Sequence, residues 1–273
     1  MAASEPRNVF LTGASSGIGL ETAKLLTARG YEVWGTSRDQ SRLPHLPRLH
    51  PVEMDLASSD SIRAGFAVAL KKAGAFDALI NNAGAGAFGP LETMPAALIR
   101  EQFQVLVDAP LELIQLVLPK MRERGRGTIL NVTSLAAQFP IPFMTPYSAA
   151  KAALGSYTQG LRVELSSTPI LVVEVRPADI NTPFHKGTKK TEAEVSAKEQ
   201  HRLKTVWDVQ TRNMATAPSA DFVARAILRA LTTPNPPPVL VVGGFFQATV
   251  TPLGARLLPP RLLEWALRRY YRL

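Results

Sequence analysis

A tyrosine and a lysine four residues apart could carry acid–base chemistry in this chain of 273 residues. Tyr147 and Lys151 fall on one face of a helix predicted over residues 147–165. Because a nearby ammonium favours a phenolate, we expect Lys151 to lower the pKa of Tyr147. A tyrosine tuned in this way can give a proton to a substrate oxygen, or take one from it, near neutral pH.

A serine hydroxyl could complete this site. Ser134 directly follows a strand predicted over residues 128–133 and precedes Tyr147 in the chain. The C-terminal ends of parallel strands face the ligand crevice, so this hydroxyl could hydrogen-bond the reacting oxygen. The predicted catalytic residues are therefore Ser134, Tyr147 and Lys151, and we expect Ser134 and Tyr147 to contact the substrate as well.

A glycine-rich turn follows the first predicted strand, at residues 9–12, and opens a helix predicted over residues 17–29. A tight turn needs residues without a Cβ atom, and the free N–H groups of a helix N-terminus attract an anion. The spacing predicts a cradle for the pyrophosphate of a dinucleotide. Its residues are Gly13, Ser15, Ser16, Gly17, Ile18 and Gly19. The alternative is a plain strand-to-helix turn, for which two glycines would suffice.

The end of the second predicted strand bears on which dinucleotide is bound. An acidic residue there binds the ribose 2′-hydroxyl of NAD, whereas an arginine favours the 2′-phosphate of NADP. Ser37 and Arg38 follow the strand predicted at residues 31–36, and this favours NADP(H) over NAD(H). In the alternative, Arg38 is merely solvated and Asp39 binds the hydroxyl.

Seven short apolar runs, separated by helical patterns, must position these side chains. Strands are predicted at residues 9–12, 31–36, 51–54, 78–81, 128–133, 170–176 and 239–242. Their alternation with helices implies a parallel sheet with right-handed crossovers. The predicted fold class is α/β, a doubly wound parallel sheet of the Rossmann type with helices on both faces. We expect one domain over residues 1–273, because no repeat or linker-like shift in composition interrupts the pattern.

Taken together, these motifs resemble the short-chain dehydrogenase/reductase family. The matching motifs are Thr12-Gly13-x-x-x-Gly17-x-Gly19, Asn81-Asn82-Ala83-Gly84, Ser134 and Tyr147-x-x-x-Lys151. The resemblance covers about residues 9–244. It implies a seven-stranded sheet, a homodimer or homotetramer, and hydride transfer between a nicotinamide and a CH–OH or carbonyl carbon, with Tyr147 as the acid or base.

The resemblance also implies further cofactor contacts. Asp55 would lie by the adenine, Lys151 would bind the nicotinamide ribose, and Thr182 would contact the carboxamide. Asn82 would brace the central strand and line the cofactor. The contacts implied beyond the glycine-rich turn are Asp55, Leu56, Asn82, Ala83, Gly84, Tyr147, Lys151, Pro177, Ala178, Ile180 and Thr182.

Two positions depart from the pattern of this family. The long helix before Ser134, which we expect to be broken at Pro110, usually carries an asparagine where this chain has Leu106. In the family that asparagine helps to hold a water linked to the active-site lysine. The usual glycine after Pro177 is Ala178 here. Because of Leu106, the alternative function is a dinucleotide-binding sensor or scaffold with little catalysis.

Aromatic residues near the predicted site indicate the substrate class. Phe139 and Phe143 lie between Ser134 and Tyr147, in a loop that borders the substrate pocket in the family. Phe245 and Phe246 could extend the same apolar wall. A small hydrophobic carbonyl or alcohol substrate is therefore expected, and the likeness is nearest to hydroxysteroid and retinol dehydrogenases. In the alternative, these aromatic side chains only cover the edge of the sheet.

Composition bears on partners and location. The formal net charge is +9, but basic and aromatic residues do not interleave, so we expect no nucleic-acid partner. The chain has no cysteine and its four histidines lack ligand spacing, so we expect no metal. The sequence shows no apolar run long enough for a membrane span and no secretory signal, and a cytoplasmic location is predicted.

Two segments depart from the strand–helix alternation. Residues 183–217 are polar, charged and weakly helical, which is typical of a lid or substrate loop inserted between regular elements. Residues 252–273 mix arginines with apolar side chains such as Trp265. This tail could cover a substrate pocket, pack on a partner subunit or contact a membrane surface peripherally.

Overall fold

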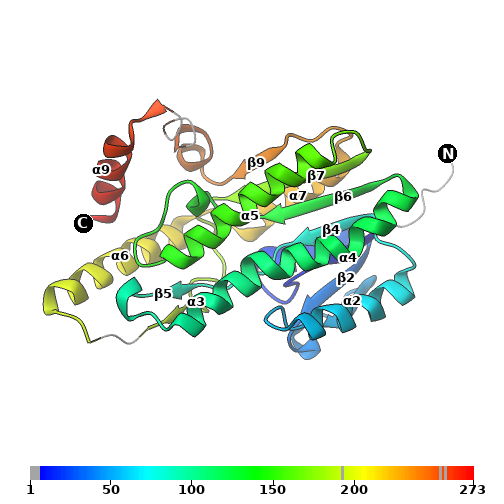
Figure 1. Cartoon of the computed structure of the whole chain (residues 1–273), viewed down its shortest axis with the longest axis horizontal. Helices are drawn as coiled ribbons and strands as arrows, with labels where there is room; N and C mark the ends of the chain where they lie inside the picture. The colour runs from blue at the N-terminus through cyan, green and yellow to red at the C-terminus, as the bar shows by residue number, and fades with distance from the viewer. Residues whose placement is uncertain (1–6, 192–193, 252–253, 255–256) are drawn as a thin grey trace.

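One parallel sheet of seven strands organises the chain (Figure 1). The computed structural model describes residues 7–191, 194–251, 254 and 257–273. The strand order is β3-β2-β1-β4-β6-β7-β9, with every neighbouring pair parallel. The strands are β1 (Asn8–Leu11), β2 (Glu32–Ser37), β3 (Leu49–Glu53), β4 (Ala78–Asn81), β6 (Gly127–Val132), β7 (Ile170–Pro177) and β9 (Val239–Val242). The predicted fold class is confirmed, and each predicted strand overlaps an observed one.

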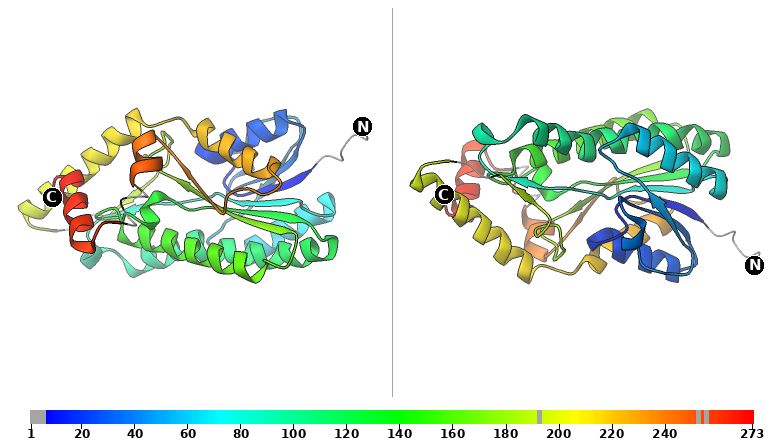
Figure 2. Two further views of the ribbon diagram at one scale, coloured as in Figure 1. Left: turned by 90° about the horizontal axis from the view of Figure 1, so that it is seen from above. Right: turned by 90° about the horizontal axis from the view of Figure 1, so that it is seen from below.

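Two layers of helices cover the sheet, one on each face (Figure 2). On one face, α1 (Gly17–Ala28) and α7 (Ala220–Thr232) pack together and bury Leu26 and Ile227 against the strands. On the other face, α2 (Ser59–Ala73), α4 (Ala109–Arg124) and α5 (Thr145–Glu164) enclose a second apolar core that includes Phe10 and Leu113. Burial of both faces explains why the strands read as continuous apolar runs rather than as alternating ones.

Prolines mark two irregular positions. Pro51 lies in β3, an edge strand of the sheet, where a missing N–H is tolerated. Pro110 cannot donate the helical hydrogen bond to the Leu106 carbonyl four residues earlier. The chain there runs from α3 (Ala96–Phe103) through a π-helical turn, η3 (Gln104–Asp108), into α4. The predicted break in this helix is thus a wider turn that begins before Pro110.

Smaller elements surround the C-terminal ends of the strands. A second sheet pairs β5 (Ala87–Phe88) with β8 (Lys189–Lys190), a pairing that the sequence did not predict. The segment predicted to be weakly helical contains a twenty-residue helix, α6 (Ala197–Thr216). The remaining turns are η1 (Gln40–Arg42), η2 (Leu91–Thr93) and η4 (Leu135–Ala137).

The chain ends beside α6 with η5 (Phe246–Val250) and α9 (Pro260–Tyr271). Within the predicted tail, Pro252, Leu253, Ala255 and Arg256 lie outside the described residues. Among the helices that the structure describes, none combines the length and the apolar character that crossing a membrane requires.

Candidate active site

A cavity of about 970 Å³ lies at the C-terminal edge of the sheet. Segments that follow β1, β2, β3, β4, β6 and β7 contribute to its wall, as expected for a ligand crevice in a doubly wound fold. The predicted residues that line it are Gly13, Ser15, Ser16, Gly17, Ile18, Ser37, Arg38, Asp55, Leu56, Asn82, Ala83, Gly84, Ser134, Phe139, Tyr147, Lys151, Pro177, Ala178, Ile180 and Thr182. Two predicted residues, Gly19 and Phe143, do not line it.

The glycine-rich turn allows close approach of backbone segments. Gly13 has φ +71°, and a Cβ atom there would lie 2.9 Å from the Ala83 Cα atom. Gly19 stands behind the turn, where a Cβ atom would lie only 2.0 Å from the carbonyl oxygen of Gly13. The turn therefore rests on the first residues of α1, whose N-terminus faces the cavity. A dinucleotide pyrophosphate fits this cradle of backbone and N–H groups.

Hydrogen bonds join the ends of β1 and β4 beside this cradle. The Thr12 hydroxyl oxygen accepts hydrogen bonds from the N–H groups of Asn82 and Ala83, both at 3.0 Å. In return, the Asn82 amide donates to the Thr12 carbonyl oxygen at 2.9 Å. The strand order reverses between these two strands, so the contacts join the strand ends at the point where doubly wound sheets bind ligands.

Two arginines line the part of the cavity that follows β2. Arg38 and Arg42 both contribute to its wall. Asp39 is not among the lining residues, and its Oδ1 atom accepts hydrogen bonds from the backbone N–H of Ser41 at 2.9 Å and from the Ser41 hydroxyl at 2.7 Å. These bonds lower the pKa of Asp39. The Asp39 carboxylate thus accepts its hydrogen bonds as the N-cap of η1.

Ser134 and Tyr147 meet at the opposite wall of the cavity. Ser134 precedes η4, and its hydroxyl oxygen accepts a hydrogen bond from the Ala136 N–H at 3.1 Å. Tyr147 is buried in the first turn of α5. Burial raises the pKa of Tyr147 to about 12, and a hydrogen bond with the Ser134 side chain opposes that rise. The two side chains therefore lie close enough to act on one substrate oxygen.

The lysine one turn further along α5 does not make the phenol acidic. The Nζ atom of Lys151 donates a hydrogen bond to the Val132 carbonyl oxygen at 2.7 Å, and this directs the ammonium toward the end of β6. Lys151 is not among the groups that shift the pKa of Tyr147. The predicted lowering of the Tyr147 pKa is therefore wrong, because desolvation outweighs the charge of a lysine that bonds elsewhere. Burial also lowers the pKa of Lys151 to about 8.

Comparison with known proteins decides the family. A family model described as short chain dehydrogenase matches residues 7–193. A 3-ketodihydrosphingosine reductase of Bacteroides thetaiotaomicron is 31% identical over 271 residues, which are 98% of this chain and 98% of the relative.

This chain belongs to the short-chain dehydrogenase family. Retinol dehydrogenase 8 of Bos taurus is 31% identical over 194 residues, 67% of this chain and 62% of that relative. The crystal structure of a short-chain dehydrogenase from Streptomyces avermitilis superposes with a TM-score of 0.82 at 28% identity and covers 97% of both chains. As a member of the family, this short-chain dehydrogenase is an oxidoreductase acting on CH–OH groups.

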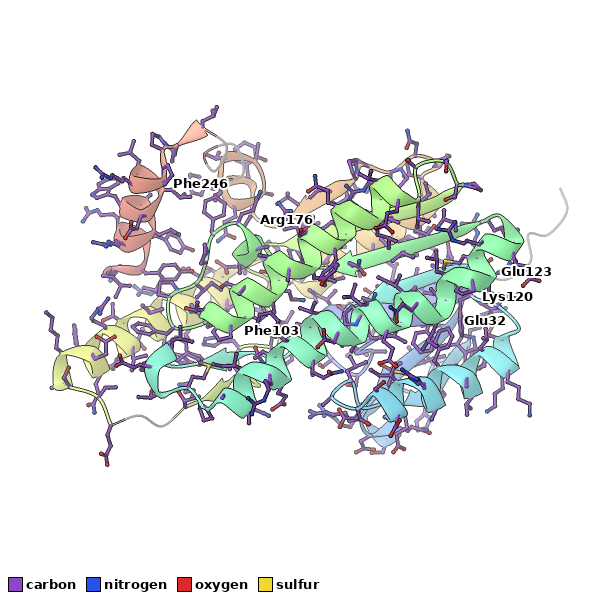
Figure 3. All side chains as sticks on the ribbon, viewed as in Figure 1. Glu32, Phe103, Lys120, Glu123, Arg176 and Phe246 are labelled. Atoms are coloured by element: carbon purple, nitrogen blue, oxygen red, sulfur yellow. The ribbon has the colours of Figure 1, made fainter. Side chains whose placement is uncertain are left out.

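Apolar side chains form one part of the cavity wall in this short-chain dehydrogenase. The wall includes Phe139 and Phe246, whereas Phe245 does not contribute to it. Figure 3 shows Phe246 beside α9, far from Glu32 at the other end of the sheet. The further apolar lining residues include Val105, Ile141, Met144, Phe184, Leu263 and Leu267. Described residues of the C-terminal tail therefore line the cavity.

Phe143, predicted to contact the substrate, does not line this cavity. This residue has φ +62° and packs against Phe88, with ring centroids 5.9 Å apart. It lines a separate surface pocket together with Leu91. Phe143 packs against the apolar cluster that contains Phe88 and Tyr147, and its left-handed backbone conformation could not be inferred from spacing.

Leu106, at the position of the usual family asparagine, is fully buried. It belongs to an apolar cluster with Tyr147, Met144 and Tyr271. Its side chain thus packs in the same cluster as Tyr147, and the backbone around it forms the π-helical turn η3. The departure replaces a polar side chain with a packing contact and leaves Ser134, Tyr147 and Lys151 on the cavity wall.

Several polar residues of the cavity wall were missed from the sequence, among them Arg42 and Asp179. Arg42 lies one short turn after Arg38, and this close spacing of two cations was a usable signal. Asp179 follows β7 and is hydrogen-bonded to Gln247 and Tyr270. Those partners are 68 and 91 residues away in the chain, so no local pattern could have indicated the contact.

Proposed function

We propose that this short-chain dehydrogenase is an NADP(H)-dependent oxidoreductase for the carbonyl or secondary alcohol group of a hydrophobic substrate. A nicotinamide dinucleotide supplies or accepts the hydride when bound. The observation that carries the proposal is that Ser134, Tyr147 and Lys151 line the same cavity as the glycine-rich turn. Acid–base groups and a pyrophosphate cradle therefore share one cavity.

Each of the three polar side chains has a distinct task in this proposal. With its pKa raised to about 12, the phenol of Tyr147 keeps its proton at neutral pH and can donate it to a carbonyl oxygen. The Ser134 hydroxyl hydrogen-bonds the same oxygen and stabilises charge that develops there. Lys151, with a pKa of about 8, remains largely protonated near neutral pH and would hold the ribose hydroxyls of the dinucleotide.

The preference for NADP(H) rests on the wall that follows β2. Arg38 and Arg42 would face the additional phosphate, which a guanidinium binds through paired N–H donors. Asp39, the group that could otherwise bind a ribose hydroxyl, is held by Ser41 outside the cavity wall. Both features support NADP(H) over NAD(H).

The apolar wall supports a hydrophobic substrate. Leu263, Leu267 and Phe246 from the C-terminal segment line the same cavity as Phe139 and Met144. The names of two relatives, a 3-ketodihydrosphingosine reductase and a retinol dehydrogenase, agree with this class because both named compounds are largely hydrocarbon. The alternative of a sensor with little catalysis gains no support from Leu106, since its packing leaves the polar site in place.

The function is tested by NADPH oxidation across a panel of hydrophobic ketones, aldehydes and quinones. We expect turnover with at least one class, and a higher kcat/KM with NADPH than with NADH. Binding of NADPH without turnover of any panel member would support the sensor instead.

We also propose that the outer face of α9 contacts an anionic membrane surface. Leu263, Ala266 and Leu267 line the cavity, while Leu262 and Trp265 are 51% and 64% exposed. The helix carries four arginines in and just after its span, and of these Arg268 pairs with Glu264. An amphipathic helix with exposed tryptophan and excess arginine is typical of interfacial binding.

Sedimentation with phosphatidylglycerol-containing vesicles tests this contact. The wild-type protein should pellet with them, whereas a Leu262→Ser, Trp265→Ser variant should stay in the supernatant. If both proteins stay in the supernatant, and light scattering gives the wild type a larger oligomeric mass than the variant, this face is a contact between subunits. We also propose that the protein forms a homodimer or homotetramer. The same light-scattering measurement gives its oligomeric mass.

A further inference from the structure

A carboxylate lies within the apolar side of the cavity without a cationic partner. Asp179 stands between Ala178 and Ile180, and all three residues line the cavity. Within the ranges that the structure describes, no lysine, arginine or histidine forms a salt bridge with Asp179. Burial raises the pKa of this carboxyl group. A desolvated acidic group without a counter-ion costs free energy, so its presence calls for a ligand that compensates it.

Neutral donors hold one oxygen of this carboxylate. The Gln247 amide donates to Oδ2 at 2.6 Å, and the Tyr270 hydroxyl donates to the same atom at 3.4 Å. Gln247 also accepts a hydrogen bond from the Asp179 backbone N–H at 3.3 Å. Behind them, the Asn213 amide donates to the Tyr270 hydroxyl oxygen at 2.6 Å. Segments from β7, η5, α9 and α6 thus orient a single carboxylate.

The second oxygen, Oδ1, is available to a ligand. Among the described residues it has no hydrogen-bond partner, and it is not one of the fully enclosed polar atoms without a partner. It therefore keeps contact with the cavity that Asp179 lines. A primary ammonium, with three N–H donors and a positive charge, matches a carboxylate oxygen presented in this way.

The position of Asp179 places such an ammonium at the same edge of the sheet as Ser134. Asp179 comes two residues after Pro177, the last residue of β7, and Ser134 comes two residues after Val132, the last residue of β6. These strands are neighbours, with Val132 opposite Val175 in the register. The carboxylate and the Ser134 hydroxyl therefore follow adjacent strand ends at the same edge of the sheet.

We propose that Asp179 binds the ammonium group of the substrate, and that the substrate is an amphiphilic amino ketone or amino alcohol. The inference rests on the proposed oxidoreductase function and narrows its substrate class. The carbonyl lies at Ser134 and Tyr147, the amine at Asp179, and the hydrocarbon chain along the wall formed by Phe246, Leu263 and Leu267. Gln247 and Tyr270 act as positioning residues, because they hold Oδ2 and leave Oδ1 to the amine.

A matched pair of ketones tests the proposal. One is a twelve-carbon α-amino ketone, and the other is the same ketone without the amine. With NADPH, the wild-type enzyme should have the lower KM for the amino ketone. Asp179→Asn keeps an oxygen for Gln247 and Tyr270 but removes the charge. It should raise the KM for the amino ketone about tenfold or more, since a hydrogen bond to a charged group contributes about 1.5–3 kcal/mol.

The plain ketone and a surface aspartate provide the controls. The KM of Asp179→Asn for the plain ketone should stay close to the wild-type value. Asp208→Asn, which changes an exposed aspartate paired with Lys204 on α6, should behave as wild type with both ketones. If Asp179→Asn raises the KM for both ketones equally, the carboxylate only anchors α9 through Tyr270, and the proposal is wrong.

Binding measured without turnover separates this inference from the proposed function. In calorimetry, dodecylamine should bind the wild-type protein more tightly than dodecanol, and Asp179→Asn should remove that difference. Equal binding of the two compounds by the wild-type protein overturns the amine subsite. If selective amine binding persists while neither ketone is reduced, the subsite stands and the proposed oxidoreductase function fails.

Discussion

The two ends of the cavity are built in different ways. At the end formed by β1 and α1, backbone atoms touch, and a Cβ atom on Gly19 would lie 2.0 Å from the Gly13 carbonyl oxygen. At the end formed by α9, only Tyr271 of the helix is buried, and Trp265 is 64% exposed. Backbone contacts thus fix the end that we propose holds the cofactor, whereas partly exposed apolar side chains form the end that we propose holds the substrate.

This difference teaches which part of the molecule tolerates change. Where backbones are in contact, any added atom forces the turn to move, because protein interiors have little free volume. Where half-buried side chains form the wall, a substitution changes the shape of the pocket and leaves the sheet intact. We therefore expect cofactor binding to be sensitive to single substitutions, and substrate preference to change with little loss of stability.

The largest effect is expected for Gly19→Ala. The added methyl group meets the Gly13 carbonyl oxygen, so overpacking should lower the free energy of unfolding by about 1–3 kcal/mol. NADPH binding, measured by fluorescence, should weaken strongly because the turn moves. Gly160→Ala on α5 is the matched control. No atom lies within 4 Å of its new Cβ atom, and alanine there should stabilise the helix by about 1 kcal/mol.

A smaller effect is expected at the ribose end of the cofactor site. Arg38→Ala should raise the dissociation constant of NADPH about tenfold, because a charged hydrogen bond to the phosphate is lost. The dissociation constant of NADH should change little. Arg100→Ala removes an exposed arginine of α3 that lies outside the cavity wall. If that control weakens NADPH binding as much as Arg38→Ala does, the preference for NADPH over NADH arises from the overall charge of the protein.

Between the two ends, Lys151 should make stability depend on pH. Its pKa is about 8 in the folded protein against an ordinary value of 10.5. Between those values the unfolded chain binds the extra proton, so the free energy of unfolding should rise with pH from about 8 toward 10. The slope should be about 1 kcal/mol per pH unit. Urea unfolding of wild type and Lys151→Met, compared over this range, should show the rise in the wild type alone.

The smallest effect is expected at the substrate wall. Leu263→Ala removes a half-buried side chain that lines the cavity. It should lower the free energy of unfolding by less than about 1 kcal/mol, while the KM for a long-chain ketone rises several-fold. A loss of stability as large as that of Gly19→Ala would show that the two ends are equally fixed, contrary to the comparison.

Much of the fold could be predicted because its signals are local. The alternation of apolar runs and helical patterns placed all seven strands of the main sheet, and the residues that follow those strands meet in one cavity. The β5–β8 pairing was missed, since two-residue strands a hundred positions apart carry no periodicity. The extent of α6 was also underestimated from the sequence. A polar segment in which only Val206, Val209 and Gln210 are buried forms a helix of 20 residues.

The chemistry of the site was harder to predict than its location. The four-residue spacing correctly placed Tyr147 and Lys151 on one helix face, but the pKa of the phenol depends on burial and on where the ammonium bonds. Phe143 lies outside the cavity wall, and neither this position nor its positive φ can be inferred from composition. The surroundings of Asp179 come from three distant parts of the chain, so only the folded structure reveals them.

The central claim is that the nicotinamide gives the hydride while Tyr147 gives the proton. Its most direct test uses NADPH that carries deuterium at the transferable position of the nicotinamide. We expect the alcohol formed by the wild-type enzyme to carry one deuterium on its carbinol carbon, as measured by mass spectrometry. Tyr147→Phe should form the same labelled product more slowly by a factor of about 10²–10⁴, with NADPH affinity retained. An unlabelled product, or wild-type rates in Tyr147→Phe, would contradict the account.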